Sequence, residues 1–300
     1  MISVIIPAYN AENYVQQNYD SLLSQLDIDF EIIYINDGST DNTYKILERI
    51  AFTDTRIKLI NQENRGAMLA RMAGLKNSSF NYVTFLDIDD TVTPNFISDF
   101  LNNLDKGYDL VATGLLLNKD GKLTQKNQIK PNVYSRNKYL ELVLTRSSWE
   151  LCGKAFNKKL FENICLPARP ISIAEDTYIY IQTVLNCTSA IMIAKSYNYI
   201  YHSVGNSISK QKNQRFIEDA FYVGTELKKI LIEKKINDVY ISSMVLLLYS
   251  NSLRRGMISK KNPHFQIVIE SFSINAMRKL PRHKSFFIFL FFLINYFFYN

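Results

Sequence analysis

Residues 1–117 alternate between two patterns, and this alternation constrains the fold more than any other feature of the chain. Short runs rich in Ile, Val, Phe and Tyr predict buried strands, and apolar residues at helical spacing follow each run. The strands are predicted at residues 1–7, 30–35, 56–60, 81–86 and 108–117, with helices near residues 12–26, 44–50, 66–75 and 94–104. This order predicts an α/β fold with a mostly parallel, Rossmann-like sheet covered by helices on both faces.

Polar residues follow four of these strands at the point where each strand ends. They are Tyr9 and Asn10 after the first, Asp37 after the second, Asn64, Arg65 and Gly66 near the third, and Asp87 and Asp89 after the fourth. Ligands of open α/β sheets bind outside the carboxyl ends of the strands, so we expect these residues to meet in one cleft. Arg71 follows on the next helix, and it is either a cation for a diphosphate or base carbonyl or an exposed helix charge.

Three carboxylates stand where the strand at residues 81–86 ends. Asp87, Asp89 and Asp90 offer hard oxygen ligands, which suit Mg²⁺ or Mn²⁺ bound together with the phosphates of a substrate. The alternative is a solvated acidic turn that caps the next helix, and for Asp90 both interpretations stay open because Pro94 suits a first helical position. For Asp87 and Asp89 together, the surrounding sequence favours a metal–diphosphate site.

The second half of the chain is less regular. After a polar turn, residues 123–134 are predicted to form a flexible excursion from the sheet. A helix is predicted at residues 139–144, strands at 190–193 and 197–202, and helices across 215–256. Trp149, the only tryptophan, is either a core residue or a stacking platform for a sugar ring.

Positive charge is concentrated near the C-terminus. Residues 211–300 hold 14 Lys and Arg against 6 Asp and Glu, which leaves 21 against 22 in residues 1–210. Thirteen of the fourteen residues 286–299 are apolar and seven are Phe, directly after the basic cluster at 278–284. Because a bilayer span needs about 20 residues, an interfacial or re-entrant membrane anchor is favoured over a full crossing, over a buried core helix and over nucleic-acid binding.

The cysteines and the first residues bear on the compartment. Cys152, Cys165 and Cys187 are odd in number and lack metal-ligand spacing, which predicts buried free thiols in a reducing compartment. The apolar run at residues 2–6 is short for a signal peptide and is interrupted by Pro7. The catalytic part is therefore expected in the cytoplasm, peripheral at the inner face of the cell membrane.

Several short motifs, taken in order, resemble the inverting family 2 glycosyltransferases with a GT-A fold. A set of motifs in order is more specific than any one alone, and the resemblance covers roughly residues 1–210. The matching segments are residues 4–10, residues 36–41, residues 64–66 with Ala70, Arg71 and Gly74, residues 86–90, and residues 174–177 preceded by Trp149 and Lys154.

The resemblance implies a role for individual residues. Pro7, Ala8, Tyr9 and Asp37 would hold the nucleotide base, usually uracil, Arg71 the nucleotide, Asp87 the ribose, and Asp89 a Mn²⁺ or Mg²⁺ that bridges two phosphates. The chain departs from the family at Asn36, where a second acidic residue is common, and at Met72, where Asn is common. Because Asp37 is retained, a uridine donor is still expected.

Glycosyl transfer also needs a base that deprotonates the acceptor hydroxyl. The resemblance makes Asp176 the candidate, and the alternative is a carboxylate that stabilises a helix N-terminus. Trp149, Glu175 and His202 are further candidates for contact with the acceptor or the diphosphate. His202, with Ser207 and Ser209 beyond it, falls where the family often closes a loop over the diphosphate, and the alternative for this histidine is a satisfied structural residue.

The sequence thus predicts a GT-A glycosyltransferase domain at residues 1–210, with a nucleotide-binding half at 1–105 and an acceptor half at 106–210. Residues 211–300 are predicted to form a helical region with a membrane-associating tail. The predicted reaction is metal-dependent, inverting transfer from a UDP-sugar to a hydroxyl of a glycan, lipid-linked or protein-linked acceptor in bacterial surface polysaccharide or glycoprotein assembly.

Two alternatives have other chemistry. One is a non-catalytic nucleotide-sugar-binding partner of another transferase, suggested by Asn36 and Met72. The other is a haloacid-dehalogenase-type phosphatase, because residues 87–91 match its Asp-x-Asp-x-Thr motif. That motif normally closes the first strand of its domain, whereas three strand–helix units precede it here.

Overall fold

The chain forms two compact units, each assembled from separate chain segments. The structure is a computed structural model, and it describes residues 1–25, 29–126, 129–203, 213–253 and 265–298. Unit 1 comprises residues 1–136, 150–165 and 183–204. Unit 2 comprises residues 137–149, 166–182 and 205–300.

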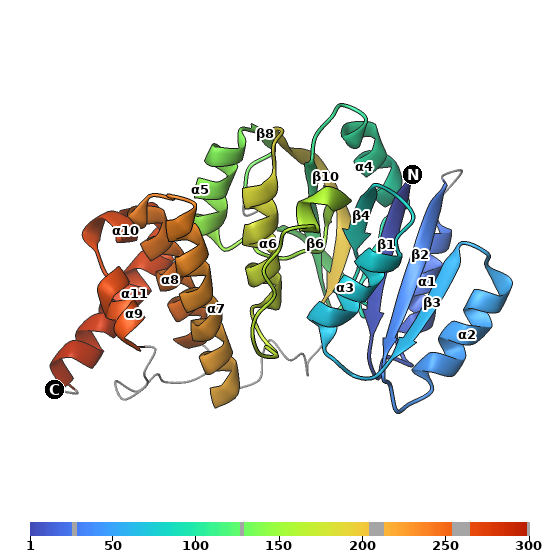
Figure 1. The fold of residues 1–300 in the computed structure, drawn as a ribbon, viewed down its shortest axis with the longest axis horizontal. Coiled ribbons are helices and arrows are strands. Elements are labelled where there is room, and N and C mark those ends of the chain that lie inside the picture. The colour runs from blue at the N-terminus through green and yellow to red at the C-terminus, as the bar shows by residue number, and fades with distance from the viewer. Residues whose placement is uncertain (26–28, 127–128, 204–212, 254–264, 299–300) are drawn as a thin grey trace. The chain divides into compact units, whose positions relative to one another are not determined.

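Unit 1 is built on one sheet with the strand order β3-β2-β1-β4-β9-β6-β10-β5, to which β7 adds on β6 and β8 on β10 (Figure 1). The strands are β1 (Ile2–Ala8), β2 (Phe30–Asp37), β3 (Ile57–Gln62), β4 (Tyr82–Phe85), β5 (Thr91–Val92), β6 (Leu110–Lys119), β7 (Lys122–Lys126), β8 (Asn132–Tyr134), β9 (Lys154–Asn157) and β10 (Ile191–His202). The predicted α/β class is confirmed. The sheet is parallel across β3, β2, β1 and β4, and it becomes mixed where β9 runs antiparallel to β4 and β6.

Helices cover both faces of the parallel part, as the alternation of apolar residues predicts. Val4 and Ile6 face one side, in a core shared with α1, α2 and α4. Ile5 faces the other side, against α3, where a Cβ added to Gly74 would lie 2.4 Å from Ile5 Cγ2. Gly74 therefore allows α3 to lie directly on the sheet. These helices are α1 (Val15–Leu23), α2 (Thr43–Thr53), α3 (Ala67–Asn77) and α4 (Phe96–Leu104), and a short 3₁₀ helix, η1 (Lys158–Phe161), follows β9.

The prediction of a flexible excursion at residues 123–134 is wrong, because this stretch contains β7 and β8. Asp120 and Gly121 both have positive φ, 51° and 81°, and they join β6 to β7 as a two-residue hairpin turn. All residues of β7 are exposed, so the strand lacks the apolar pattern on which the prediction relied. The separately predicted strands at 190–193 and 197–202 are one strand, β10, interrupted by register shifts.

Unit 2 is helical. Its buried residues include Trp149, Phe221 and Tyr249, and the hydroxyls of Tyr139 and Tyr180 lie 2.6 Å apart. Among the described residues, no helix has the length and apolar content needed to cross a membrane. The helices are α5 (Arg136–Arg146), α6 (Glu175–Asn186), which continues into unit 1, α7 (Gln214–Glu233), α8 (Asp238–Leu253), α9 (Phe265–Ser271), α10 (Ile274–Lys279) and α11 (Arg282–Phe298).

The cysteines are free thiols, as predicted, but they are not all buried. Burial raises the pKa of Cys152 well above its usual range and that of Cys187 to about 12. Cys165 is exposed, which corrects the expectation of three buried thiols.

Asp109, directly before β6, fastens three parts of unit 1. Its carboxylate accepts hydrogen bonds from the backbone N–H groups of Thr188 and Ser189, both at 2.9 Å, and lies 3.0 Å from Lys159 Nζ. Burial alone would raise the pKa of Asp109, but the hydrogen bonds from Ser189 and Thr188 and the ammonium of Lys159 together lower it to about 2.

We expect Asp109→Asn to lower the free energy of unfolding at pH 7, and the loss to shrink in acid. The pKa of Asp109 is lower in the folded chain than its ordinary value of 3.8, so the stabilisation is complete above that value and disappears as pH falls toward about 2. Chemical denaturation of both proteins at several pH values measures the difference. The exposed Asp105→Asn is the control, and a difference that stays constant from pH 7 to pH 2.5 would contradict the role of the charge.

Candidate functional site

The turns after β1 and β2 are joined by side-chain hydrogen bonds. Asn10, with a φ of 46°, accepts a hydrogen bond from Thr40 N at 2.8 Å, and its own N–H donates to Ser39 Oγ at 3.0 Å. These contacts fix the turn beside Tyr9, whose side chain is 50% exposed. The predicted base-contact segment Pro7–Tyr9 therefore ends in an exposed aromatic ring at the carboxyl edge of the sheet.

Asp37, at the end of β2, is buried and organises the start of α3. Its carboxylate accepts hydrogen bonds from Gln62 Nε2 at 2.7 Å, from Arg65 N at 2.9 Å and from Gly66 N at 2.8 Å. The close turn needs a glycine at position 38, because its φ is 70° and an added Cβ would lie 2.6 Å from Asn64 N. Asp37 thus fixes the segment that connects β3 to α3.

Arg71 on α3 forms an ion pair with Asp87. Arg71 is only 5% exposed, and its Nη2 lies 2.7 Å from Asp87 Oδ1. The alternative of an exposed helix charge is therefore wrong. The pair joins α3, which follows β3, to the turn that follows β4.

Asn18 of α1 holds the turn Asp87–Asp90, called here the carboxylate turn, and the sequence analysis did not predict this role. Its Nδ2 donates to the carbonyls of Asp87 at 3.2 Å and Asp90 at 2.9 Å, while its Oδ1 accepts from Tyr34 Oη at 3.0 Å. The available signal was a polar residue among the buried positions of α1, since Val15, Asn18 and Leu22 are the buried residues of this helix.

Asp90 is buried and does not cap a helix. Its carboxylate accepts hydrogen bonds from Tyr199 Oη at 2.6 Å and from His202 N at 2.9 Å. Helix α4 begins at Phe96 instead, with Asn95 at the N-cap position. Burial, followed by the charge of Asp87, raises the pKa of Asp90 to about 8. The capping interpretation of Asp90 is therefore wrong, and Tyr199 is a second contact residue that the sequence did not reveal.

Asp89 is the carboxylate of this turn that best fits a metal ligand. Asp87 pairs with Arg71 and Asp90 binds Tyr199, whereas the pKa of Asp89 is raised by burial and then by the charge of Asp87. A carboxylate destabilised in this way gains from a nearby cation. Within the described ranges no three His, Cys, Asp or Glu residues group as a metal site.

His202 contacts the residue that follows the carboxylate turn. Its Nε2 lies 2.8 Å from Thr91 Oγ1 and its Nδ1 lies 3.3 Å from Asn118 Nδ2. Burial lowers the pKa of the imidazole, which favours the neutral ring at neutral pH. Both ring nitrogens of His202 therefore have partners, which agrees with a structural role and is compatible with a ligand contact. Ser207 and Ser209 lie outside the described residues.

Glu175 and Asp176 form the first turn of α6, directly after Ala174, whose φ is 64°. The segment before them is held by α7, because the buried Asp219 accepts hydrogen bonds from Arg169 Nη1 and, at 2.8 Å, from Ser172 N. Position in a first helical turn agrees with the helix-stabilising alternative for Asp176 and is compatible with a base, so the catalytic role of Asp176 stays a prediction.

Trp149 also belongs to unit 2. Its side chain is buried, and its indole N–H donates to the carbonyl of Val143 at 2.9 Å. This environment supports the core alternative for Trp149 over a stacking platform.

Comparison with known proteins now decides the family. Residues 3–165 match the sequence model described as Glycosyl transferase family 2. The chain belongs to this family. The stretch contains the turns after β1 and β2, Arg71 and the carboxylate turn, and membership removes the support for a haloacid-dehalogenase-type phosphatase.

Named relatives share part of their length with the chain. Glycosyltransferase GlyA of Streptococcus pneumoniae is 30% identical over 232 residues, which are 72% of this chain and 32% of that protein. Hyaluronan synthase of Pasteurella multocida is 29% identical over 230 residues, 72% of this chain and 22% of the synthase. The chain thus spans about a third or less of these two relatives.

A solved structure of S. aureus TarS in complex with UDP-GlcNAc has the same fold. The TM-score is 0.69 at 18% identity, and the match covers 94% of this chain and 82% of that chain. The predicted GT-A fold is therefore confirmed.

We expect Asn18→Ala to destabilise the chain by about 1–3 kcal/mol, because it leaves two carbonyls and the hydroxyl of Tyr34 without their buried partner. The free energy of unfolding from urea denaturation measures this loss. Gln17→Ala, an exposed position on the same helix, is the matched control. Equal stability of the two variants would show that Asn18 does not hold the carboxylate turn.

Proposed function

We propose that this chain is an inverting, metal-dependent glycosyltransferase that moves a sugar from a UDP-sugar to an acceptor hydroxyl. The observation that carries the proposal is the carboxylate turn after β4, compensated by Arg71 and lying beside β1, where the order of the parallel strands reverses. Such a reversal is where open α/β sheets bind nucleotides. Residues 1–105 are proposed as the nucleotide-binding half, residues 106–210 as the acceptor half and residues 211–300 as a helical region with a membrane-associating tail.

A uridine donor is supported by the retained Asp37 and by the exposed ring of Tyr9. The solved TarS complexes hold UDP-GlcNAc and UDP. In the proposal, Pro7, Ala8 and Tyr9 contact the base. Asp37 accepts from the base N–H and keeps the turn before α3 in place.

Arg71 and Asp87 together would position the nucleotide. The ion pair fixes the Asp87 carboxylate, which the proposal assigns to the ribose. The guanidinium carries positive charge toward the phosphates. A Mn²⁺ or Mg²⁺ bound at Asp89 would supply further positive charge against the leaving diphosphate.

Asp176 is proposed as the base that takes the proton of the acceptor hydroxyl. The oxygen of the acceptor then attacks the anomeric carbon while the bond to the diphosphate breaks, so the configuration at that carbon inverts. Glu175 and His202 are kept as proposed contacts of the acceptor or diphosphate.

The acceptor is proposed to be a glycan, lipid-linked or protein-linked hydroxyl in bacterial surface polysaccharide or glycoprotein assembly. One relative is named hyaluronan synthase, which fits a growing glycan. The basic, Phe-rich tail supports work at the inner face of the cell membrane, with the catalytic part in the cytoplasm. Release of UDP from UDP-sugars tests the enzyme against the alternative of a non-catalytic binding partner, which would release none.

UDP should raise the melting temperature only in the presence of Mn²⁺ or Mg²⁺, because the carboxylates would otherwise repel the diphosphate. At a UDP concentration of about 100 times Kd, we expect a rise of about 5–10 °C. Asp89→Ala should abolish this rise, and the exposed Asp29→Ala should retain it. Equal stabilisation of the unaltered protein in EDTA would remove the metal from the proposal.

Asp176→Asn should lower turnover about 10²–10⁴-fold, because the amide keeps the size of the side chain but cannot accept the proton. UDP binding should stay unchanged. The exposed Glu218→Gln, also in unit 2, should turn over normally. Near-normal turnover in Asp176→Asn would transfer the role to Glu175.

NMR coupling constants should show a β-linked product from an α-linked donor, and a retained α linkage would overturn inversion.

A further inference from the structure

The C-terminal helices of unit 2 expose large apolar side chains that the proposed chemistry does not use. Ile274 of α10 is 70% exposed and Phe286 of α11 is 67% exposed, and Phe289 and Leu290 are also exposed. Ile288, in contrast, is fully buried. The described part of α11 therefore carries apolar side chains both on its buried face and on its solvent-exposed face. This is typical of a helix whose exposed face contacts a membrane or another apolar partner.

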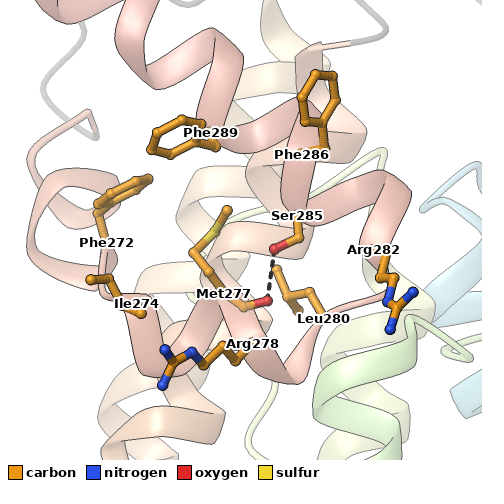
Figure 2. Close-up of a pocket in the computed structure, with 9 residues that line it drawn as sticks. All are labelled: Phe272, Ile274, Met277, Arg278, Leu280, Arg282, Ser285, Phe286 and Phe289. Atoms are coloured by element: carbon orange, nitrogen blue, oxygen red, sulfur yellow. Dashed lines mark hydrogen bonds between the residues drawn. The ribbon is translucent and has the colours of Figure 1, made fainter.

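Ile274, Phe286 and Phe289 line a pocket of about 550 Å³ between α10 and α11. Its apolar walls include Phe272, Met277, Phe286 and Phe289 (Figure 2). The hydroxyl of Ser285 donates to the carbonyl of Met277 at 2.8 Å, so this polar group is already satisfied. The volume falls in the range of roughly 300–1,000 Å³ that suits a small ligand, and the walls suit a hydrocarbon chain.

Two arginines also line the pocket. Figure 2 shows Arg278 on α10, below Met277, and Arg282 at the start of α11, with their guanidinium groups pointing in different directions. Both arginines are exposed. Because a guanidinium binds phosphate through paired N–H donors, the pocket combines a site for an anionic head group with a site for an acyl chain.

We propose that this pocket binds one anionic phospholipid of the membrane surface, an inference that rests on the proposed membrane association. The phosphate would lie against Arg278 or Arg282, with the other arginine adding positive charge nearby, and an acyl chain would extend between Phe286 and Phe289. The exposed phenylalanines around the pocket would then enter the interfacial region of the bilayer.

Charge favours a lipid over a second copy of this chain as the occupant. A two-fold contact through this surface would bring the arginines of both copies together, and like charges repel. The 14 Lys and Arg against 6 Asp and Glu in residues 211–300 instead match an anionic bilayer.

Calorimetric titration of the full chain with dihexanoyl phosphatidylglycerol, below its micelle concentration, tests the pocket directly. We expect saturable binding of one lipid. Dihexanoyl phosphatidylcholine and inorganic phosphate, titrated in parallel, should bind more weakly. The first lacks the net negative charge of the head group, and the second lacks the acyl chains. Phosphate that binds as tightly as the lipid would overturn the proposal in favour of a simple anion site.

Variants separate the two ends of the pocket. Arg278→Gln with Arg282→Gln should weaken binding of the anionic lipid about 30-fold, or about fivefold for each charge removed. Phe286→Ser with Phe289→Ser should weaken the binding of both dihexanoyl phosphatidylglycerol and dihexanoyl phosphatidylcholine. The exposed residues Arg215 and Phe52 provide matched controls, and Arg215→Gln and Phe52→Ser should bind as the unaltered chain does.

Co-sedimentation with phosphatidylcholine vesicles, with and without phosphatidylglycerol, distinguishes the possible failures. A chain that binds anionic vesicles but no short-chain lipid retains the proposed membrane association and lacks the pocket site. A chain that binds neither lacks both, while UDP-dependent stabilisation of the same sample reports separately on the donor site. A concentration-dependent dimer that Phe286→Ser dissociates would assign the surface to a second copy and overturn the lipid.

Discussion

Repulsion among three carboxylates in one turn is the constraint on which the site depends. Asp87, Asp89 and Asp90 follow β4 within five residues, and the fold compensates each of the outer two differently. Arg71 approaches Asp87 from α3, while the hydroxyl of Tyr199 and a backbone N–H reach Asp90 from β10. The pKa of Asp89 is raised by burial and by the charge of Asp87, so a cation beside this carboxylate would stabilise its charged form.

Much of the nucleotide half could be predicted because its signals are local. The runs that become β1, β2 and β4 are rich in apolar residues, and the polar residues that follow them meet because parallel strands end on one edge. The ion pair between Arg71 and Asp87 was not predicted, because the sequence left Arg71 open between a cation for the diphosphate or base and an exposed helix charge. The hairpin of β6 and β7 was missed because exposed residues in β7 outweighed the Asp120–Gly121 turn signal.

The parts that could not be predicted depend on distant partners. In the sequence, Asn18 is one polar residue on a helix. Its role depends on a hydrogen bond to Asp87, which lies 69 residues away along the chain. Asp90 reads as a helix cap until Tyr199, 109 residues later, is seen to bind it. Position along the sequence gives no measure of such contacts, whereas the burial of a polar side chain requires that some partner exist.

The contacts of Asp219 with Arg169 and Ser172 form only after a delay during synthesis of the chain. Asp219 lies 50 residues beyond Arg169, so at roughly 5–20 residues per second it leaves the ribosome about 2.5–10 s later. Until then, the segment that leads into Asp176 lacks the carboxylate that holds it. A chain interrupted after residue 204 would contain every residue of unit 1 and would leave the predicted base on an unsecured segment.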